Sequence, residues 1–181
     1  MSAVWEQPHQ ILLYEGEASV SMPKQQPGRS KHNYSTPLDF MTAIARRLEI
    51  EEFAFDFAAD EFNTKAPYFF DEKDDALVQR WAPDLIKPEE WAWCNPPDGN
   101  IGPWAEKCMK FGYERNVALL VPASIGSNWF RDFVDGDALV LLLNGRLTFE
   151  GCTMPYLKDC ILALYGPGIV PAYEVWDWRK A

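Results

Sequence analysis

Histidine is scarce in this chain, and its cysteines are widely spaced. The 181 residues include 2 histidines and 4 cysteines, and no Cys-x-x-Cys pair occurs. A zinc site needs about four such ligands at short spacings, and Ser-His-Asp or Cys-His catalysis needs a histidine inside the fold. Both histidines, His9 and His32, precede the core-forming segments. The sequence therefore predicts no metal site and no histidine-assisted nucleophile, with the cysteines reduced and mostly buried.

Long apolar runs and phosphate-binding glycine loops are also missing. No stretch reaches the roughly 20 apolar residues of a membrane-spanning helix, and the amino terminus lacks the basic and apolar segments of a secretory signal. A Walker-type phosphate loop is absent as well. We therefore expect a cytoplasmic protein that contacts no membrane.

Basic residues are fewer than acidic ones: the chain has 17 Lys and Arg against 27 Asp and Glu, and its net charge is -10. Proteins that hold DNA through its phosphates usually carry a basic face, so this balance argues against tight non-specific DNA binding. A local basic cluster remains, formed by Lys24, Arg29 and Lys31 among loop-forming residues. It is either a solvated loop or a contact for phosphates.

Hydrophobic residues make up 48% of the chain and aromatic residues 14%, enough for one sizeable core. The chain is short for two domains. We expect residues 35–181 to form a single domain, preceded by a strap and basic loop at residues 1–34. In that first segment, Ile11–Tyr14 is either a short strand or an apolar strap across the core.

Helical and strand patterns alternate along the expected domain. Helices are predicted from Thr36 and Pro37 to Glu49, at 103–111 and at 129–133, with the charge run 71–75 as a solvated helix start. Strands are predicted at 53–57, 91–94, 117–121 and 138–142, with 147–149 and 160–165 as an antiparallel pair. The alternation predicts an α/β fold with three layers and a mostly parallel sheet.

The apolar run 91–94 meets a polar amide and two prolines, Asn95-Pro96-Pro97. Two prolines cannot continue a ladder, so the chain leaves the sheet at Asn95, at the strand end where open α/β sheets bind ligands. The Asn95 side-chain oxygen and a backbone carbonyl held by the prolines form two acceptors that fit an exocyclic amino group. Accepting both N–H bonds leaves the nitrogen lone pair available to attack a methyl group. A proline-ended strand with a turn-forming asparagine is the alternative interpretation.

The tetrapeptide Asn95-Pro96-Pro97-Asp98 resembles the Asn/Asp-Pro-Pro-aromatic motif of methyltransferases that act on adenine or cytosine amino groups, and it departs at Asp98. Other segments recur in the family order: Ser35-Thr36-Pro37, Phe55–Ala59, Asp75-Ala76-Leu77 with Trp81, and Trp104–Lys107. As an ordered set over about residues 34 to 165, the chain resembles the phage DNA N-6-adenine methyltransferases of the Dam type.

This resemblance implies the compact, Rossmann-like fold of class I S-adenosylmethionine-dependent methyltransferases. It implies methyl transfer from S-adenosylmethionine to a flipped adenine, in double- or single-stranded DNA. The implied catalytic residues are Asn95, Pro96, Pro97 and Asp98. The implied cofactor contacts are Thr36, Pro37, Asp56, Phe57, Ala58, Ala59 and Asp75, with Asp74 as the alternative to Asp75.

Asp56 is placed to pair with the ammonium of the methionine moiety, although a lone aspartate at a strand end is also a common turn former. Ala58 and Ala59 stand where other methyltransferases have a glycine loop. Asp98 offers no ring on which a flipped base can stack. Either Trp93 or Trp104 takes that role, or both tryptophans pack in the core. If neither ring stacks on the base, flipping is less favourable and single-stranded DNA becomes a relatively better substrate.

Lys24, Arg29 and Lys31 are the expected phosphate contacts. The resemblance also implies a phage or prophage gene, the host cytoplasm and a link to restriction-modification. Two other functions remain open: an inactive S-adenosylmethionine-binding module, and an acidic DNA mimic that inhibits a DNA-binding enzyme. A mimic needs carboxylates along one face, whereas these acids are scattered among core-forming segments. Methyl transfer is therefore the favoured function.

Overall fold

The computed structural model describes residues 35–180, so the predicted strap and the basic cluster at Lys24, Arg29 and Lys31 lie outside the described residues. The helical elements are α1 (Leu38–Leu48), η1 (Pro83–Leu85), α2 (Gly102–Gly112), α3 (Asn128–Phe133) and η2 (Trp178–Lys180). The strands are β1 (Phe55–Asp56), β2 (Tyr68–Phe69), β3 (Trp91–Cys94), β4 (Asn116–Pro122), β5 (Leu139–Leu143), β6 (Cys160–Tyr165) and β7 (Ala172–Trp176). Among these residues no helix is long and apolar enough to cross a membrane.

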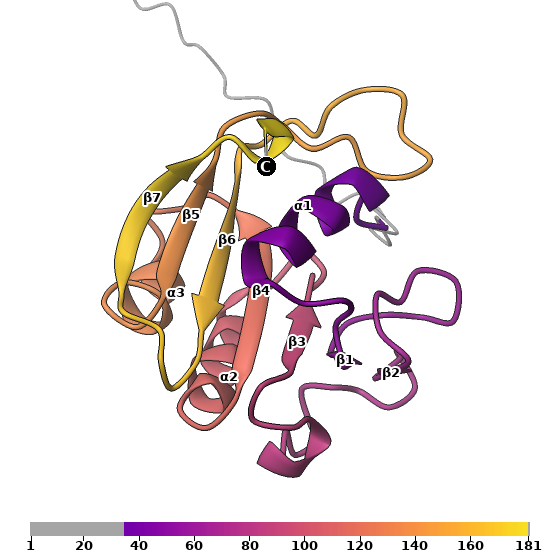
Figure 1. The fold of residues 1–181 in the computed structure, drawn as a ribbon, viewed down its shortest axis with the longest axis vertical. Coiled ribbons are helices and arrows are strands. Elements are labelled where there is room, and N and C mark those ends of the chain that lie inside the picture. The colour runs from indigo at the N-terminus through magenta and orange to yellow at the C-terminus, as the bar shows by residue number, and fades with distance from the viewer. Residues whose placement is uncertain (1–34, 181) are drawn as a thin grey trace, which may run out of the picture. The chain divides into compact units, whose positions relative to one another are not determined.

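The strands form a 7-stranded sheet in the order β2-β1-β3-β4-β6-β5-β7 (Figure 1). Neighbouring strands are parallel except at β6, which runs antiparallel to both β4 and β5. The predicted α/β fold with a mostly parallel sheet is confirmed.

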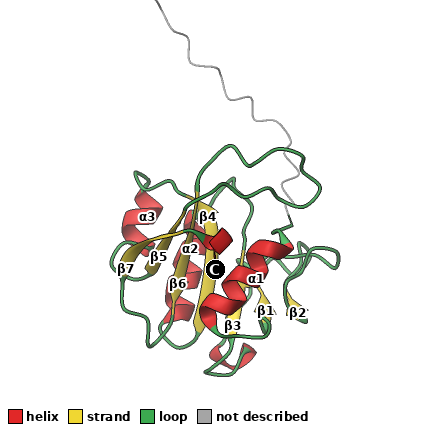
Figure 2. Ribbon diagram, turned by 45° about the horizontal axis from the view of Figure 1, so that its top comes forward, coloured by secondary structure: helices red, strands yellow, loops and turns green. Residues whose placement is uncertain are grey.

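Helices cover both faces of the sheet, with α1 on one side and α2 and α3 on the other (Figure 2). Successive side chains of a strand point to opposite faces, and β3 serves both. Trp91 and Trp93 pack in the core beneath α1, whereas Ala92 and Cys94 pack in the core beneath α2. A strand covered on both faces has no polar side, which explains the continuous apolar run at 91–94.

Helix α1 begins at Leu38, with Pro37 in an extended conformation as its N-cap. Phe40 and Ile44 are fully buried on its inner face. Asp39 in the first turn and two arginines in the last turn complement the helix dipole. The helix ends at Glu49, whose φ of 56° lets its N–H reach carbonyls of the preceding turn. The predicted helix is confirmed, although Thr36 makes no cap and has another partner described below.

The predicted strand at 147–149 is wrong. These residues belong to the long loop between β5 and β6, and Leu147 and Phe149 are buried in the core on the α1 side. Their alternation reflects two side chains that anchor a loop, and periodicity cannot distinguish that from a strand. The second predicted partner, 160–165, is β6, which pairs with β4 and β5 instead.

The charge run at 71–75 forms turns and no helix. The Asp71 carboxylate accepts hydrogen bonds from the backbone N–H of Lys73, at 2.7 Å, and of Asp74, at 3.0 Å. Asp75 has a positive φ of 50°. Short polar side chains offer the backbone partners that compete with a helix, and the run contains several of them.

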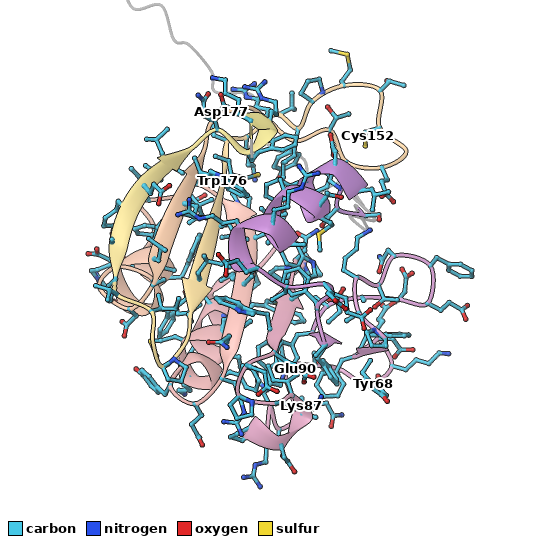
Figure 3. All side chains as sticks on the ribbon, viewed as in Figure 1. Tyr68, Lys87, Glu90, Cys152, Trp176 and Asp177 are labelled. Carbon is cyan, nitrogen blue, oxygen red and sulfur yellow. The ribbon has the colours of Figure 1, made fainter. Side chains whose placement is uncertain are left out.

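All four cysteines are free thiols, as predicted. Cys94, Cys108 and Cys160 are buried, whereas Cys152 is exposed. Figure 3 shows Cys152 on the loop between β5 and β6. Burial raises the pKa of Cys94 well above its usual value, with Cys108 adding to the effect. The Cys94 thiol is therefore a neutral packing group.

At Gly112, α2 lies very near β6, because a Cβ added there would lie 2.4 Å from Cβ of Tyr165. We predict that Gly112→Ala destabilises the protein by about 1–3 kcal/mol through overpacking. Gly102→Ala, in the same helix, places its Cβ at an ordinary 3.6 Å from Trp129 and should be neutral or stabilising. Urea unfolding of both variants checks this, and equal effects of the two would contradict it.

Candidate active site

The order of the strands indicates where on the sheet a ligand is expected to bind. From β1 the chain moves to β2 on one side and then returns to β3 on the other side of β1. Such a switch point, at the carboxyl ends of parallel strands, is where open α/β sheets bind their ligands. Asp56 ends β1, opposite Trp93 of β3, and Asn95 follows β3 directly. Two of the predicted functional residues therefore stand on neighbouring strand ends.

Asp56 is 2% exposed and holds the loop that follows β1. Its Oδ1 accepts from the N–H of Ala58 at 3.1 Å, and its Oδ2 accepts from the N–H of Lys65 at 3.0 Å. Burial raises the pKa of Asp56 to about 6, while the two backbone hydrogen bonds and the charge of Lys65 act in the opposite direction. The carboxylate is thus a desolvated anion that titrates just below neutral pH.

The residues after Asp56 divide between core and surface. Phe57 is fully buried, and its ring stacks on Trp81 with 3.7 Å between centroids and 7° between planes. Its predicted contact with a cofactor is therefore limited to the backbone. Ala58 and Ala59 are half-buried, and the Ala59 N–H donates to the carbonyl of Phe70 at 3.1 Å. Small side chains leave this turn accessible from the strand ends.

Asn95 is half-buried, and its Nδ2 donates a 3.1 Å hydrogen bond to Oγ1 of Thr36. Thr36 is 1% exposed and precedes the Pro37 N-cap of α1. Because the amide nitrogen is bonded to Thr36, the Oδ1 atom of the same amide points away from Thr36. Thr36, expected from the sequence to line a cofactor site, thereby also orients the Asn95 amide.

Three charged and polar side chains, Lys65, Ser35 and Glu150, form a cluster that no local sequence pattern indicated. Lys65 Nζ donates to Ser35 Oγ at 2.8 Å, and Ser35 Oγ donates to Glu150 Oε2 at 2.7 Å. Lys65 Nζ also lies 3.7 Å from Glu150 Oε1, and the Lys65 side chain is 16% exposed. The cluster joins the loop after β1, the start of α1 and the β5–β6 loop.

Asp98, the fourth residue of the tetrapeptide, contacts the same long loop. The hydroxyl of Tyr156 donates to Oδ2 of Asp98. Tyr156 is half-buried and packs edge-to-face with Phe149, with 5.4 Å between centroids and 83° between planes. Burial raises the pKa of Cys160, at the start of β6, to about 12, and the nearby charge of Asp98 adds to this. Sequence reasoning missed Tyr156 because nothing in its local pattern marks it.

The two tryptophans predicted as stacking platforms pack in the core. Trp93 is 1% exposed and packs against Phe53, so burial contradicts a stacking role for its ring. Trp104 is half-buried on the α2 side, 6.3 Å from the ring of Trp81. Asn95, by contrast, contacts Thr36 at the start of α1. Trp93 is therefore on the α1 side but buried, and Trp104 packs on the opposite face of the sheet.

Asp75 is exposed, in the turns that pack on α2. The amine of the neighbouring Lys107 donates to the carbonyls of Ala76 and Gln79, and it lies 5.1 Å from the Trp81 ring. Asp75 therefore stays a predicted cofactor contact, in a turn next to Lys107 of α2. Within residues 35–180 no group of three or more potential metal ligands comes together.

The 7-stranded, mostly parallel sheet with helices on both faces is the compact, Rossmann-like fold of a methyltransferase. A family model described as DNA N-6-adenine-methyltransferase (Dam) matches residues 24–159, and the chain belongs to this family. The resemblance seen in the sequence is thus confirmed. A search of curated proteins gave no match. The match includes Asp56, the tetrapeptide and Tyr156.

The raised pKa of Asp56 predicts a pH-dependent cost to stability. Its pKa is about 6 in the folded protein against an ordinary 3.8, so the folded state binds more protons between these values. Stability from this group therefore falls as pH rises from about 4 to 6, by up to about 3 kcal/mol. The free energy of unfolding of Asp56→Asn, relative to that of the wild type, should therefore increase by that amount between pH 4 and 7. Urea unfolding at several pH values measures this difference.

Asparagine loses the hydrogen bond from Lys65, which adds a constant offset between the two unfolding curves. The pH-dependent part of the difference is therefore the quantity to compare. Asp84→Asn, at an exposed position, is the matched control and should run parallel to the wild type. A constant difference between wild type and Asp56→Asn across this range would contradict the assigned pKa.

Proposed function

We propose that this protein transfers the methyl group of S-adenosylmethionine to N6 of an adenine in DNA. The hydrogen bond between Asn95 and Thr36 carries the proposal, because it orients an amide at the end of β3, the strand that pairs with β1 and its buried Asp56. Family membership supports the reaction, and the arrangement of these side chains supports their roles. S-adenosylmethionine supplies, when bound, an electrophilic methyl group with a sulfonium leaving group.

Asn95 acts on the nucleophile. Its Oδ1, together with a backbone carbonyl held by Pro96 and Pro97, accepts the two N–H bonds of the adenine amino group. The nitrogen lone pair is then directed away from the protein acceptors. Thr36 holds the amide in place before substrate arrives, so little reorganisation is needed during the reaction. The proton released from N6 after transfer leaves to water.

Asp56 acts on the methyl donor. A desolvated carboxylate at the end of β1 suits the ammonium of the methionine moiety, and its two backbone hydrogen bonds hold it in position. With a pKa of about 6 it is mostly ionised at neutral pH. The half-buried Ala58 and Ala59 allow a ligand to approach the turn closely.

DNA enters with its target adenine outside the duplex, since a stacked base cannot present N6 to a methyl donor. We assign the phosphate contacts to Lys24, Arg29 and Lys31, which lie outside the described residues and within the family match. The resemblance to phage enzymes supports a phage or prophage origin, action in the host cytoplasm and a link to restriction-modification.

Removing the amide should abolish catalysis and spare cofactor binding. Asn95→Ala is expected to lower the methylation rate by about a hundredfold or more, because a preorganised hydrogen-bond partner is lost. Asn100→Ala, an exposed amide in the following turn, is the matched control. Nucleoside analysis of DNA incubated with labelled S-adenosylmethionine gives the rates. Wild-type turnover by Asn95→Ala would refute the role of the amide.

In the same assay, Thr36→Val keeps the shape of the side chain and removes the hydroxyl that orients Asn95, so a smaller loss, about tenfold, is expected. Thr36→Ser restores the hydroxyl and should restore the rate. Equal rates for valine and serine variants would show that the hydrogen bond does not position the amide.

Cofactor binding should depend on the ionisation of Asp56. Since the ionised form pairs with an ammonium, affinity is expected to rise as pH increases through about 6. At a hundred times its dissociation constant, S-adenosylhomocysteine stabilises the protein by about 2.7 kcal/mol, which a melting curve detects. The melting shift should grow between pH 5 and 7.5 in the wild type and stay flat in Asp56→Asn. A shift that is independent of pH in the wild type would contradict this contact.

A further inference from the structure

The tetrapeptide carries an aspartate at its fourth position, and the fold brings a tyrosine to that aspartate. The Tyr156 hydroxyl donates to Asp98 Oδ2 across a long separation in sequence. The side chain of Asp98 is therefore engaged by an aromatic residue from the β5–β6 loop. A ring is present next to the tetrapeptide although none is encoded within it.

Tyr156 is held at three points. Asp98 binds its hydroxyl, Phe149 packs edge-to-face on its ring, and its N–H donates to the carbonyl of Leu147 at 2.7 Å. Leu147 and Phe149 are buried, so both contacts are made to fixed groups. A ring anchored in this way keeps one orientation, which lowers the entropy lost when a flat ligand packs against it.

The loop that carries Tyr156 is tied to the same segment that orients Asn95. The Glu150 N–H donates to the carbonyl of Ser35 at 3.0 Å, and the Ser35 hydroxyl donates back to Glu150. Thr36, the next residue, accepts from Asn95. The β5–β6 loop, through Glu150, and Asn95 are thus both hydrogen-bonded to the two residues Ser35 and Thr36 that precede α1. Trp104 packs on the opposite face of the sheet and shares none of these anchors.

We propose that Tyr156 supplies the stacking surface for the flipped adenine, and that Asp98 is a positioning residue that aims its ring. This inference rests on the proposed function, whose amino-group acceptor is Asn95. Base stacking on an aromatic ring is sequence-tolerant, because every base has a π-face. The half-buried Tyr156 ring takes the place of the aromatic residue that the tetrapeptide lacks.

The ring is tested first by Tyr156→Ala and Tyr156→Phe. Alanine should slow methylation of duplex DNA by about five- to a hundredfold, the effect of losing one stacked base. Phenylalanine keeps the ring and loses only the hydrogen bond to Asp98, so its rate should fall less than that of the alanine variant and by about as much as that of Asp98→Ala. Leu157→Ala, at the neighbouring and 85% exposed residue, is the matched control and should be unaffected. An unchanged rate in Tyr156→Ala overturns the inference.

The position of the ring is tested by rescue. Adding Asp98→Tyr to Tyr156→Ala returns an aromatic side chain to the tetrapeptide and should recover most of the lost rate. Asp98→Asn should retain more activity than Asp98→Ala, because it keeps an acceptor for the Tyr156 hydroxyl. The penalty of Asp98→Ala should disappear in the Tyr156→Ala background, since the aspartate acts through the ring. Additive penalties, or no rescue by tyrosine, overturn the role of Asp98.

Base stacking is measured separately from turnover with 2-aminopurine opposite an abasic site in a duplex of mixed sequence, where unstacking costs least. Stacking on Tyr156 should quench the bound probe, so its emission should be higher with Tyr156→Ala than with the wild type or Leu157→Ala. Equal emission in all three overturns the inference even if the wild type methylates DNA. A wild type that quenches the probe through Tyr156 but never methylates adenine refutes the proposed function and leaves the stacking site supported.

Discussion

The buried hydroxyl of Thr36 is the contact on which the arrangement of the site depends. The hydroxyl accepts a hydrogen bond from the Asn95 amide. The preceding residue, Ser35, is hydrogen-bonded to Lys65 and Glu150, and the following residue, Pro37, is the N-cap of α1. An amide or hydroxyl left unpaired in the interior costs about 1–3 kcal/mol, so the contact resists any shift of the helix relative to the sheet. The orientation of Asn95 is therefore set by how α1 docks as well as by the prolines that follow it.

Much of the fold could be predicted from the sequence, because strands that are buried on both faces of the sheet consist of continuous apolar residues. The run at 91–94 is apolar throughout because α1 and α2 cover opposite sides of β3, and it was predicted with its observed bounds. The loop at 147–149 has the same kind of apolar character for another reason, the anchoring of two side chains, and was mistaken for a strand. Strand β7 exposes Tyr173 and Val175 at the sheet edge and offered no pattern to predict.

The site residues that could be predicted are those marked by a short stretch of local sequence. Asp56 and Asn95 stand at strand ends, and strand ends are marked by local sequence. The contacts of Lys65 with Ser35 and Glu150, and of Tyr156 with Asp98, join segments far apart in the chain, and single side-chain hydrogen bonds leave no periodic trace. Burial likewise decides that Trp93 packs and that Asp56 titrates near pH 6, and burial is a property of the assembled layers.

The reversed direction of β6 has a geometric consequence for the strand ends. Parallel strands are joined by connections that cross to the opposite edge of the sheet, whereas antiparallel neighbours begin and end at one edge. Because β6 opposes β5, it starts where β1, β3 and β5 finish, and the β5–β6 connection never has to leave that edge. Residues can be added to or removed from this connection without displacing a strand. One inverted strand thus gives an otherwise parallel sheet a loop at its functional edge, whose length can change between the anchored positions Leu147, Phe149 and Tyr156.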